Sequence, residues 1–192
     1  GVPLEQFARA PQSLINQLFA MLTIYATMGG VSWNQDSNWL ESGVYCGWFG
    51  VGCFFVETIS SLRLPENGLK GSLPAEIGNL ESLRALDLHG NLEMTGTLPS
   101  EIVSLTSLDH LDISGSPMGG VVPTILGNLT TLNRLELSSC EFVGPIPSEL
   151  FRLTSIRFMS LANNRLHGPL PTEMGGLRRM DLLRLNGNHF TG

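Results

Sequence analysis

The sequence predicts an α/β solenoid, in which short parallel strands stack side by side behind a helical cap at the N-terminal end. Three observations predict it. A unit of 24 or 25 residues recurs along the chain, 27 of the 32 leucines lie at or after Leu62, and the residues before the first unit differ in composition. Such a period indicates a repeat architecture whose units each contact only their neighbours. We therefore divide the 192 residues into a capping region, residues 1–57, and leucine-rich repeats, residues 58–192, with five full repeats and a truncated sixth.

The capping region contains a predicted helix over residues 12–28. Its apolar side chains share one broad helical face, and Gly29 and Gly30 follow it, as expected at the C-terminus of a helix. Three tryptophans come next: Trp33, Trp39 and Trp48. They either pack inside the cap or form a platform for carbohydrate. A cap is required on physical grounds, because the first unit of a solenoid otherwise exposes one side of its core.

Cys46 and Cys53 bracket the segment CGWFGVGC. The six residues between them can close a small loop with both Cα atoms in disulfide range. The alternatives are two reduced, buried thiols or a metal-binding pair. No histidine lies nearby and the sequence has no second cysteine pair, so a zinc site lacks ligands. We favour the disulfide, which implies an oxidising compartment and therefore an extracellular or cell-surface location, reached through the secretory pathway.

Each repeat begins with a strand-like segment of the pattern LxxLxL. The six segments are ISSLRLPEN, LRALDLHGN, LDHLDISGS, LNRLELSSC, IRFMSLANN and MDLLRLNGN. Alternate apolar residues point into one core, and the residues between them point outward. One such strand is too short to be stable alone, so the copies are expected to stack into a parallel sheet. A Gly-x-apolar-Pro segment follows, and after it we predict one short helical turn on the outer side.

The ninth position of each segment is a predicted buried turn. It holds Asn67, Asn91, Ser116, Cys140, Asn164 and Asn188. An asparagine there can bond the backbone groups of neighbouring turns, which otherwise would be buried without partners. We therefore interpret Cys140 as a small buried member of this ladder rather than as a reactive thiol.

The unit LxxLxLxxNxLxGxIPxxLGxLxxL resembles the plant-type leucine-rich repeat of receptor-kinase ectodomains, receptor-like proteins and polygalacturonase inhibitors. The resemblance covers residues 59–192 in six registers. It implies a right-handed, curved solenoid with a parallel sheet on the concave side. It also implies a second, smaller sheet near the Gly-x-Ile-Pro segments.

Residues 18–53 resemble the N-terminal cap that precedes such repeats. The family element Cys-x-Trp-x-Gly-Val-x-Cys is matched by Cys46, Trp48, Gly50, Val51 and Cys53. The resemblance implies that the two cysteines are bonded. It also implies that the three tryptophans occupy packing positions, so we favour core packing over a carbohydrate platform.

The concave face is the predicted binding surface. The outward residue between the two strand leucines runs Arg63, Asp87, Asp112, Glu136, Ser160 and Arg184. We predict a ligand-binding stripe there, formed by Asp87, His89, His110, Asp112, Arg134, Glu136 and Phe158. Its acidic centre suits a basic or amphipathic peptide, or a polyhydroxylated glycan. The alternative is a solvated face whose charge pairs, such as Arg63–Asp87 and Arg134–Glu136, contribute little free energy.

Catalysis has little support in the sequence. Asp87, His89, His110 and Asp112 could in principle bind a metal ion or exchange protons. However, a flat solenoid sheet offers no deep pocket and few convergent ligands. The chain also contains no nucleophile elbow, phosphate loop or HExxH motif. We therefore expect no enzyme activity, no metal and no cofactor.

Charge, hydropathy and one short motif bound the function further. A net charge of −6, with 11 basic side chains spread thinly, argues against nucleic acid as a partner. No apolar run approaches the length that crosses a membrane, so no membrane span is expected in this segment. Asn128 begins Asn-Leu-Thr, the one glycosylation sequon in the sequence, on the outer side of the predicted solenoid. It is either glycosylated or simply a polar turn residue, and we favour glycosylation.

The last repeat ends at LNGNHFTG without a terminal capping unit. We expect its core edge to be covered by a continuation of the chain, a partner or a second copy. The sequence thus predicts an extracellular leucine-rich-repeat recognition module that binds a protein, peptide or glycan and catalyses no reaction. The alternative is a structural subunit of an extracellular wall, matrix or filament assembly. Only the frequency of roles within the family favours the first.

Overall fold

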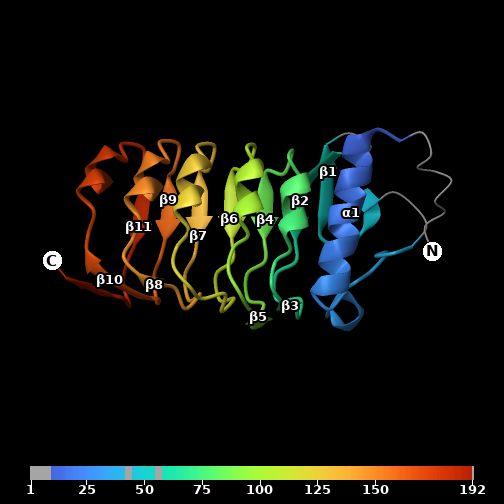
Figure 1. Ribbon diagram of the computed structural model, residues 1–192, viewed down its shortest axis with the longest axis horizontal. Coiled ribbons are helices and arrows are strands. Elements are labelled where there is room, and N and C mark those ends of the chain that lie inside the picture. Colours follow the sequence, from blue (N-terminus) through green and yellow to red (C-terminus); the bar gives the residue numbers. More distant parts are fainter. Residues whose placement is uncertain (1–9, 42–44, 55–57, 192) are drawn as a thin grey trace.

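The computed structural model describes residues 10–41, 45–54 and 58–191 (Figure 1). Helix α1 (Gln12–Thr27) stands at one end, and successive coils stack along the long axis up to strand β12 (His189–Thr191) near the other end. Each coil contributes one strand to a large sheet and one short helix. The predicted α/β solenoid with a parallel sheet and an N-terminal helical cap is therefore confirmed.

The large sheet has seven strands in the order β1-β2-β4-β6-β7-β9-β11. Their bounds are β1 Val51–Phe54, β2 Thr58–Arg63, β4 Ala85–Asp87, β6 His110–Asp112, β7 Arg134–Glu136, β9 Phe158–Ser160 and β11 Leu182–Arg184. Strand β1 runs antiparallel to β2, and every later pair is parallel. The register aligns the central apolar residue of each repeat: Leu62, Leu86, Leu111, Leu135, Met159 and Leu183. All but Leu183 are fully buried, so the core lies directly behind the sheet.

The Gly-x-apolar-Pro segments form the expected second sheet, but in two pieces. One piece pairs β3 (Lys70–Gly71) with β5 (Glu93–Met94). The other has the order β12-β10-β8, with β10 at Arg165–Pro169 and β8 at Val143–Gly144. The glycines at this bend adopt positive φ, 72° at Gly71 and 84° at Gly144, a conformation that other residues reach only with strain.

A 3₁₀ helix follows the proline in each of five repeats, where a short helical turn is predicted. The five helices are Ala75–Asn79, Ser100–Ser104, Thr124–Asn128, Ser148–Arg152 and Thr172–Gly176, and two more lie in the cap at Gly30–Ser32 and Tyr45–Gly47. The fixed φ of proline suits the extended residue just before a helix, and its missing N–H leaves no donor unpaired there. The prediction of one helical turn per repeat is confirmed.

The asparagine ladder also forms as predicted. Asn91 is fully buried, and its Oδ1 accepts hydrogen bonds from the backbone N–H groups of Asn67 (2.9 Å) and Leu69 (3.0 Å). Its Nδ2 donates to the carbonyl oxygens of Leu64 and Leu88, at 2.9 and 2.8 Å. One side chain thus satisfies four backbone groups in two repeats.

The third and fourth repeats place smaller residues at the same position. Ser116 Oγ accepts from the Asn91 N–H and donates to the Leu88 carbonyl, both at 3.0 Å. Cys140 is fully buried, with its Sγ 3.1 Å from the carbonyl oxygen of Ile113. The interpretation of Cys140 as a ladder residue is confirmed.

The cap covers the first repeat with a helix and an aromatic cluster. Helix α1 ends at Thr27, one residue earlier than predicted, and Gly29 follows with φ 77°. The buried side chain of Gln17 accepts a hydrogen bond from Ile59 N of β2 at 2.9 Å, which fixes α1 against the first strand. The three tryptophans are buried in one aromatic cluster: Trp39 stacks on Tyr25 and contacts the edges or tilted faces of Trp33 and Trp48. They therefore pack in the core, and a carbohydrate platform is ruled out.

Cys46 and Cys53 form the predicted disulfide, with Cα atoms 5.7 Å apart. The bond joins a 3₁₀ turn of the cap to β1, the strand that pairs with the first repeat. The boundary between residues 1–57 and 58–192 remains a prediction. Within the described residues, no helix combines the length and apolar character needed to cross a membrane.

The last repeat is less well covered than the others. Leu183, Leu185 and Phe190 are only half-buried, whereas their counterparts in the preceding repeat, Met159 and Leu161, are fully buried. This edge of the core therefore presents apolar surface at the end of the stack.

Candidate functional site

The predicted stripe lies on one face of the large sheet, in the register expected from the sequence. Asp87 on β4 stands opposite Asp112 on β6, which stands opposite Glu136 on β7. Neighbouring strands lie about 4.8 Å apart, so three carboxylates in one row repel one another unless they are neutralised. The surrounding side chains determine how each carboxylate is neutralised.

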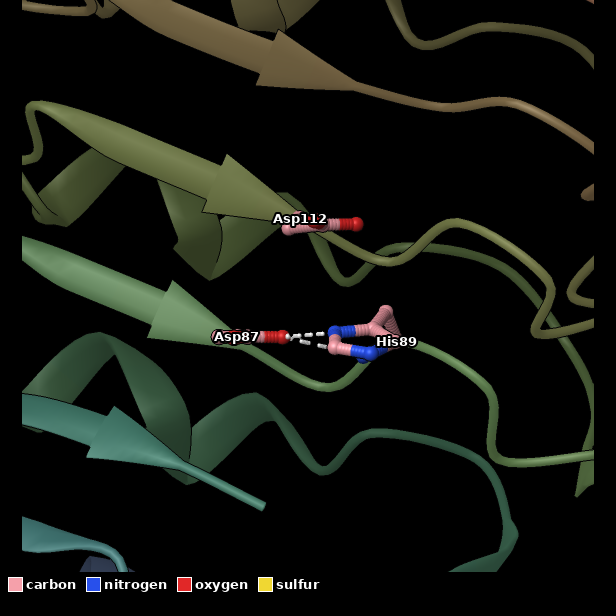
Figure 2. Close-up of side chains that lie close together, drawn as sticks. All are labelled: Asp87, His89 and Asp112. Carbon is pink, nitrogen blue, oxygen red and sulfur yellow. Dashed lines mark hydrogen bonds and ion pairs between the residues drawn. The ribbon is translucent and has the colours of Figure 1, made fainter. Parts of the chain in front are cut away.

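Two of the three carboxylates lie near His89 (Figure 2). The Asp87 Oδ1 atom is 2.8 Å from His89 Nδ1 and also accepts the His89 backbone N–H at 3.2 Å. Burial lowers the pKa of His89, but the hydrogen bond that its ring donates to Asp87 and the charges of Asp87 and Asp112 outweigh this effect, so the pKa rises. Asp112 accepts hydrogen bonds from the N–H and hydroxyl of Ser114, at 2.9 and 2.6 Å. The predicted pair between Asp87 and Arg63 is not formed, because Asp87 is engaged by His89 instead.

Asp87, His89 and Asp112 also offer one ligand atom each within 4.8 Å of one another. Two carboxylates and an imidazole are ligands that a divalent cation accepts. All three side chains are half-buried, and carboxylates often lie this close without any ion. The cluster is the one place in the described chain where a metal could be held by three such residues, and the absence of a metal remains a prediction.

The third carboxylate, Glu136, differs from the sequence-based expectation. The sequence predicts an exposed side chain, but Glu136 is only 8% exposed. Arg134, two residues earlier on β7, donates a hydrogen bond to Glu136 Oε1, and its guanidinium lies over the Phe158 ring, 4.1 Å from the centroid. Burial raises the pKa of Glu136 and Asp112 adds to the rise, while Arg134 opposes it. Glu136 is thus a support for Arg134 rather than a free ligand group.

His110 is the second histidine of the stripe. It is half-buried on β6, opposite Ala85 on one side and Arg134 on the other. Burial lowers the pKa of His110, and the positive charges of Arg134 and Arg63 lower it further, against the opposing charges of Asp112 and Asp87. The pKa of His110 is thus shifted in the opposite direction from that of His89.

The sequence did not predict a groove on this protein, but the structure has an open one of about 880 Å³. We call it the basic groove. Its ionisable lining residues are Arg63, Arg84, Asp109, His110, Arg157 and Arg179. It follows the edge at which the chain enters strands β4 to β11. The same alignment that gave the stripe contains its signal: the residue just before each strand runs Arg84, Asp109, Asn133, Arg157 and Asp181.

Two other predicted sites lie away from the sheet face. Asn128 ends a 3₁₀ helix on the outer side of a repeat, and its side chain is exposed. Burial raises the pKa of the Cys140 thiol to about 12, so this cysteine is not a nucleophile at neutral pH.

The fold and the sheet face define a class of protein: a solenoid of leucine-rich repeats with a disulfide-bonded N-terminal cap and a polar sheet face. The family model for the leucine-rich repeat region matches residues 61–162, more than half of the chain. The chain therefore belongs to the leucine-rich repeat family, in the plant extracellular form that the sequence predicts.

The relatives are plant receptor proteins. A probable inactive leucine-rich repeat receptor-like protein kinase from Arabidopsis thaliana is 36% identical over 89 residues, which are 46% of this chain and 13% of the relative. The structure is similar to that of the BIR3–SERK2 complex from Arabidopsis thaliana, with 33% identity and a TM-score of 0.77 over 92% of this chain and 95% of that one.

A second solved structure is the leucine-rich repeat ectodomain of the Arabidopsis thaliana receptor kinase GASSHO1/SCHENGEN3 in complex with CASPARIAN STRIP INTEGRITY FACTOR 2. Identity is 29% and the TM-score is 0.80, over 93% of this chain and 21% of that one. Among the curated relatives, the matches cover 13%, 5% and 10% of each relative's length. The chain thus corresponds to a small part of those proteins.

Proposed function

We propose that this chain is a non-catalytic recognition module of an extracellular, receptor-like protein, and that it binds a protein or peptide along the concave face. One observation carries the proposal: the Arg134 guanidinium contacts both the Glu136 carboxylate and the Phe158 ring, on the sheet face that also carries Asp87 and Asp112. Two of the similar structures were solved as complexes, BIR3 with SERK2 and GASSHO1/SCHENGEN3 with CASPARIAN STRIP INTEGRITY FACTOR 2.

The chemistry of the stripe favours a ligand with a cationic group and an apolar group. Asp112 is half-buried and its neighbours are acidic, so a lysine, an arginine or a free amino terminus is favoured there. Phe158 and Leu182 lie side by side on β9 and β11 and offer apolar contact, with Leu182 40% exposed. Arginine and aromatic residues dominate binding energy in many interfaces, so Arg134 and Phe158 are the expected anchors. His89 and His110 add hydrogen-bonding groups to the stripe. A polyhydroxylated glycan on the same face is the second class of partner.

The test begins with peptides selected on the purified protein from a random display library. Their affinity is then compared for the wild type, Asp112→Ala and Phe158→Ala, with Glu149→Ala as the control on the outer 3₁₀ helix. We expect each stripe variant to weaken binding by about tenfold or more, roughly 1.4 kcal/mol, and the control to bind like the wild type. Equal affinity for all four proteins would place the binding surface elsewhere.

We also propose that Asn128 carries an N-linked glycan. The sequon is exposed on the outer side of its repeat, where a glycan leaves the concave face open. Peptide mapping by mass spectrometry after secretion from eukaryotic cells should find the modification, and Asn128→Gln should abolish it. An unmodified Asn128 in the secreted protein would contradict this proposal.

The alternative function is a subunit of an extracellular assembly, and the last repeat is the surface through which two copies of this polypeptide would meet. Leu183, Leu185 and Phe190 are half-buried, and a surface of this kind favours contact with a second copy. We propose that a polypeptide ending at Gly192 self-associates through it. Sedimentation velocity should then detect a dimer whose fraction rises with concentration and falls in Phe190→Asp. A monomer at all concentrations would remove the support for assembly.

A further inference from the structure

The basic groove concentrates positive charge in an acidic protein. Four arginines line it, and Asp109 is the one acidic residue among its described lining residues. The whole chain has only 11 lysine and arginine residues and a net charge of −6. More than a third of its cationic side chains (four of 11) therefore converge on one groove, which makes that groove attractive to an anion.

Backbone hydrogen bonds between adjacent repeats fix the positions of the groove residues relative to one another. The Arg84 carbonyl accepts the N–H groups of both Asp109 and His110 at 2.9 Å, and the Asn133 carbonyl accepts that of Arg157 at 2.9 Å. The Arg84 guanidinium also lies over the Phe54 ring, 4.5 Å from its centroid. Ordered arginines lose less conformational entropy when they bind an anion.

The positive charge gathers at the two ends of the groove. Arg84 precedes β4 and Arg157 precedes β9, three strand spacings apart in the sheet, which corresponds to about 14 Å. Arg63 accompanies Arg84 at one end, and Arg179 accompanies Arg157 at the other. Asp181 lies 3.8 Å from Arg157, but both side chains are largely exposed, so an arriving carboxylate can replace this contact at little cost.

The middle of the groove is lined by hydroxyl and amide groups. Thr131 Oγ1 donates to the Leu108 carbonyl at 2.7 Å, which leaves its lone pairs free to accept from a ligand hydroxyl. Asn133 and Ser155 lie beside it. Ala85 is the one apolar residue among the described residues that line the groove, and His110 is the one with an aromatic ring. The groove therefore lacks the apolar pocket that anchors a peptide side chain, and it has a single half-buried imidazole in place of the several rings on which successive nucleobases stack.

We propose that the basic groove binds an acidic oligosaccharide, a chain of uronic acid units. Such a ligand carries carboxylates that the arginines at each end can hold in bidentate fashion, and hydroxyls that the central side chains can bond. It needs no apolar contact. The groove shares His110 with the concave stripe, but its four arginines are not members of the stripe, so variants of those arginines test this proposal separately from peptide binding there.

The test uses a galacturonic acid hexasaccharide as the probe and its fully methyl-esterified form as the ligand control. The esterified form has the same length and hydroxyl groups but no charge. Affinity is measured by calorimetry for the wild type and for the double variant Arg84→Ala/Arg157→Ala. The matched control is Arg152→Ala/Arg165→Ala, which removes two exposed arginines outside the groove.

We expect the charged hexasaccharide to bind the wild type and the matched control equally, and the groove variant at least about tenfold more weakly. Esterification, or an increase in NaCl from about 50 to about 300 mM, should weaken binding to a similar degree. Three outcomes would overturn the proposal: no binding of the probe, equal losses in both double variants, or equally tight binding of a hexaglutamate peptide, which would assign the groove to acidic peptides.

Discussion

The guanidinium carbon of Arg134 on β7 lies 4.1 Å from the centre of the Phe158 ring on β9, at directly paired positions of the sheet. Arg184 approaches the same ring from the next strand, at 5.5 Å. Cation–π contacts of this kind contribute about 0.5–1 kcal/mol when exposed, and more when water is excluded. Arg134 also donates a hydrogen bond to the buried Glu136, so one guanidinium contacts both the aromatic ring and the carboxylate.

The buried Glu136 carboxyl gives the first prediction. Burial raises its pKa above the ordinary value of 4.5, so the folded protein binds this proton more tightly than the unfolded chain. Its contribution to the free energy of unfolding is therefore undiminished below the unfolded pKa and is lost as pH rises through the higher folded pKa. Glu136→Gln removes this titration. We expect the variant to gain stability relative to the wild type between about pH 4 and about pH 7.

Urea denaturation of both proteins across this pH range measures the difference. Glu81→Gln, a substitution of an exposed glutamate, is the control and should show no such trend. A wild type that gains stability relative to Glu136→Gln as pH rises would mean that the Arg134 contact outweighs burial.

The rows of outward-facing residues on the sheet can be predicted from the sequence, because the leucine period determines which residues of neighbouring strands stand opposite one another. Asp87, Asp112 and Glu136 therefore lie in one row as predicted. The period does not determine how each side chain then turns. Arg134 could reach Glu136 on its own strand or a residue on a neighbouring strand, and that choice depends on rotamers and on the Phe158 ring. The burial of Glu136 follows from this choice and could not be predicted.

The basic groove was missed for a different reason. Two of its arginines, Arg84 and Arg157, directly precede a strand, but the two repeats between them hold Asp109 and Asn133 at that position, so the sequence shows no repeated basic motif. Only the bend of the chain into successive strands brings Arg84 and Arg157 to one edge. The fold could thus be predicted from periodicity, whereas this site depends on side chains that periodicity does not constrain.

The cap disulfide gives a prediction of stability. Cys46 and Cys53 are seven positions apart, so the bond closes a short loop and restricts the unfolded chain only modestly. The loop-entropy relation gives about 2–3 kcal/mol for the loss of this bond. We expect Cys46→Ala/Cys53→Ala to lower the free energy of unfolding by that amount in chemical denaturation. A reductant should lower the stability of the wild type toward that of the variant and leave the variant unchanged; if the reductant has no effect on the wild type, the bond is absent.

We expect the Cys140 thiol to be unreactive toward thiol reagents in the folded protein. Its side chain is fully buried, and the pKa of its thiol is raised to about 12. At about pH 8 the thiolate fraction is then on the order of one in ten thousand. We expect a maleimide to label no cysteine in the native protein and one in the denatured, unreduced protein. Rapid labelling under native conditions would mean that the fourth repeat opens locally.

The asparagine ladder gives the sharpest test of what holds the repeats together. Asn91→Ala leaves the N–H groups of Asn67 and Leu69 and the carbonyl of Leu64 without a partner, whereas the Leu88 carbonyl keeps the hydrogen bond from Ser116 Oγ. Each buried group left unpaired costs about 1–3 kcal/mol, so we expect a loss of at least about 3 kcal/mol in the free energy of unfolding. Asn91→Ser should cost roughly half as much, because Ser116 at the equivalent position makes one accepting and one donating bond.

Asn128→Ala is the matched control, since it removes the same side chain from an exposed site on an outer 3₁₀ helix. Its effect should stay within about 0.5 kcal/mol. Chemical denaturation of the four proteins orders them: wild type and Asn128→Ala together, then Asn91→Ser, then Asn91→Ala. If Asn91→Ala were as stable as the wild type, water or relaxation of the turns would be satisfying these backbone groups, and apolar packing alone would hold adjacent coils in register.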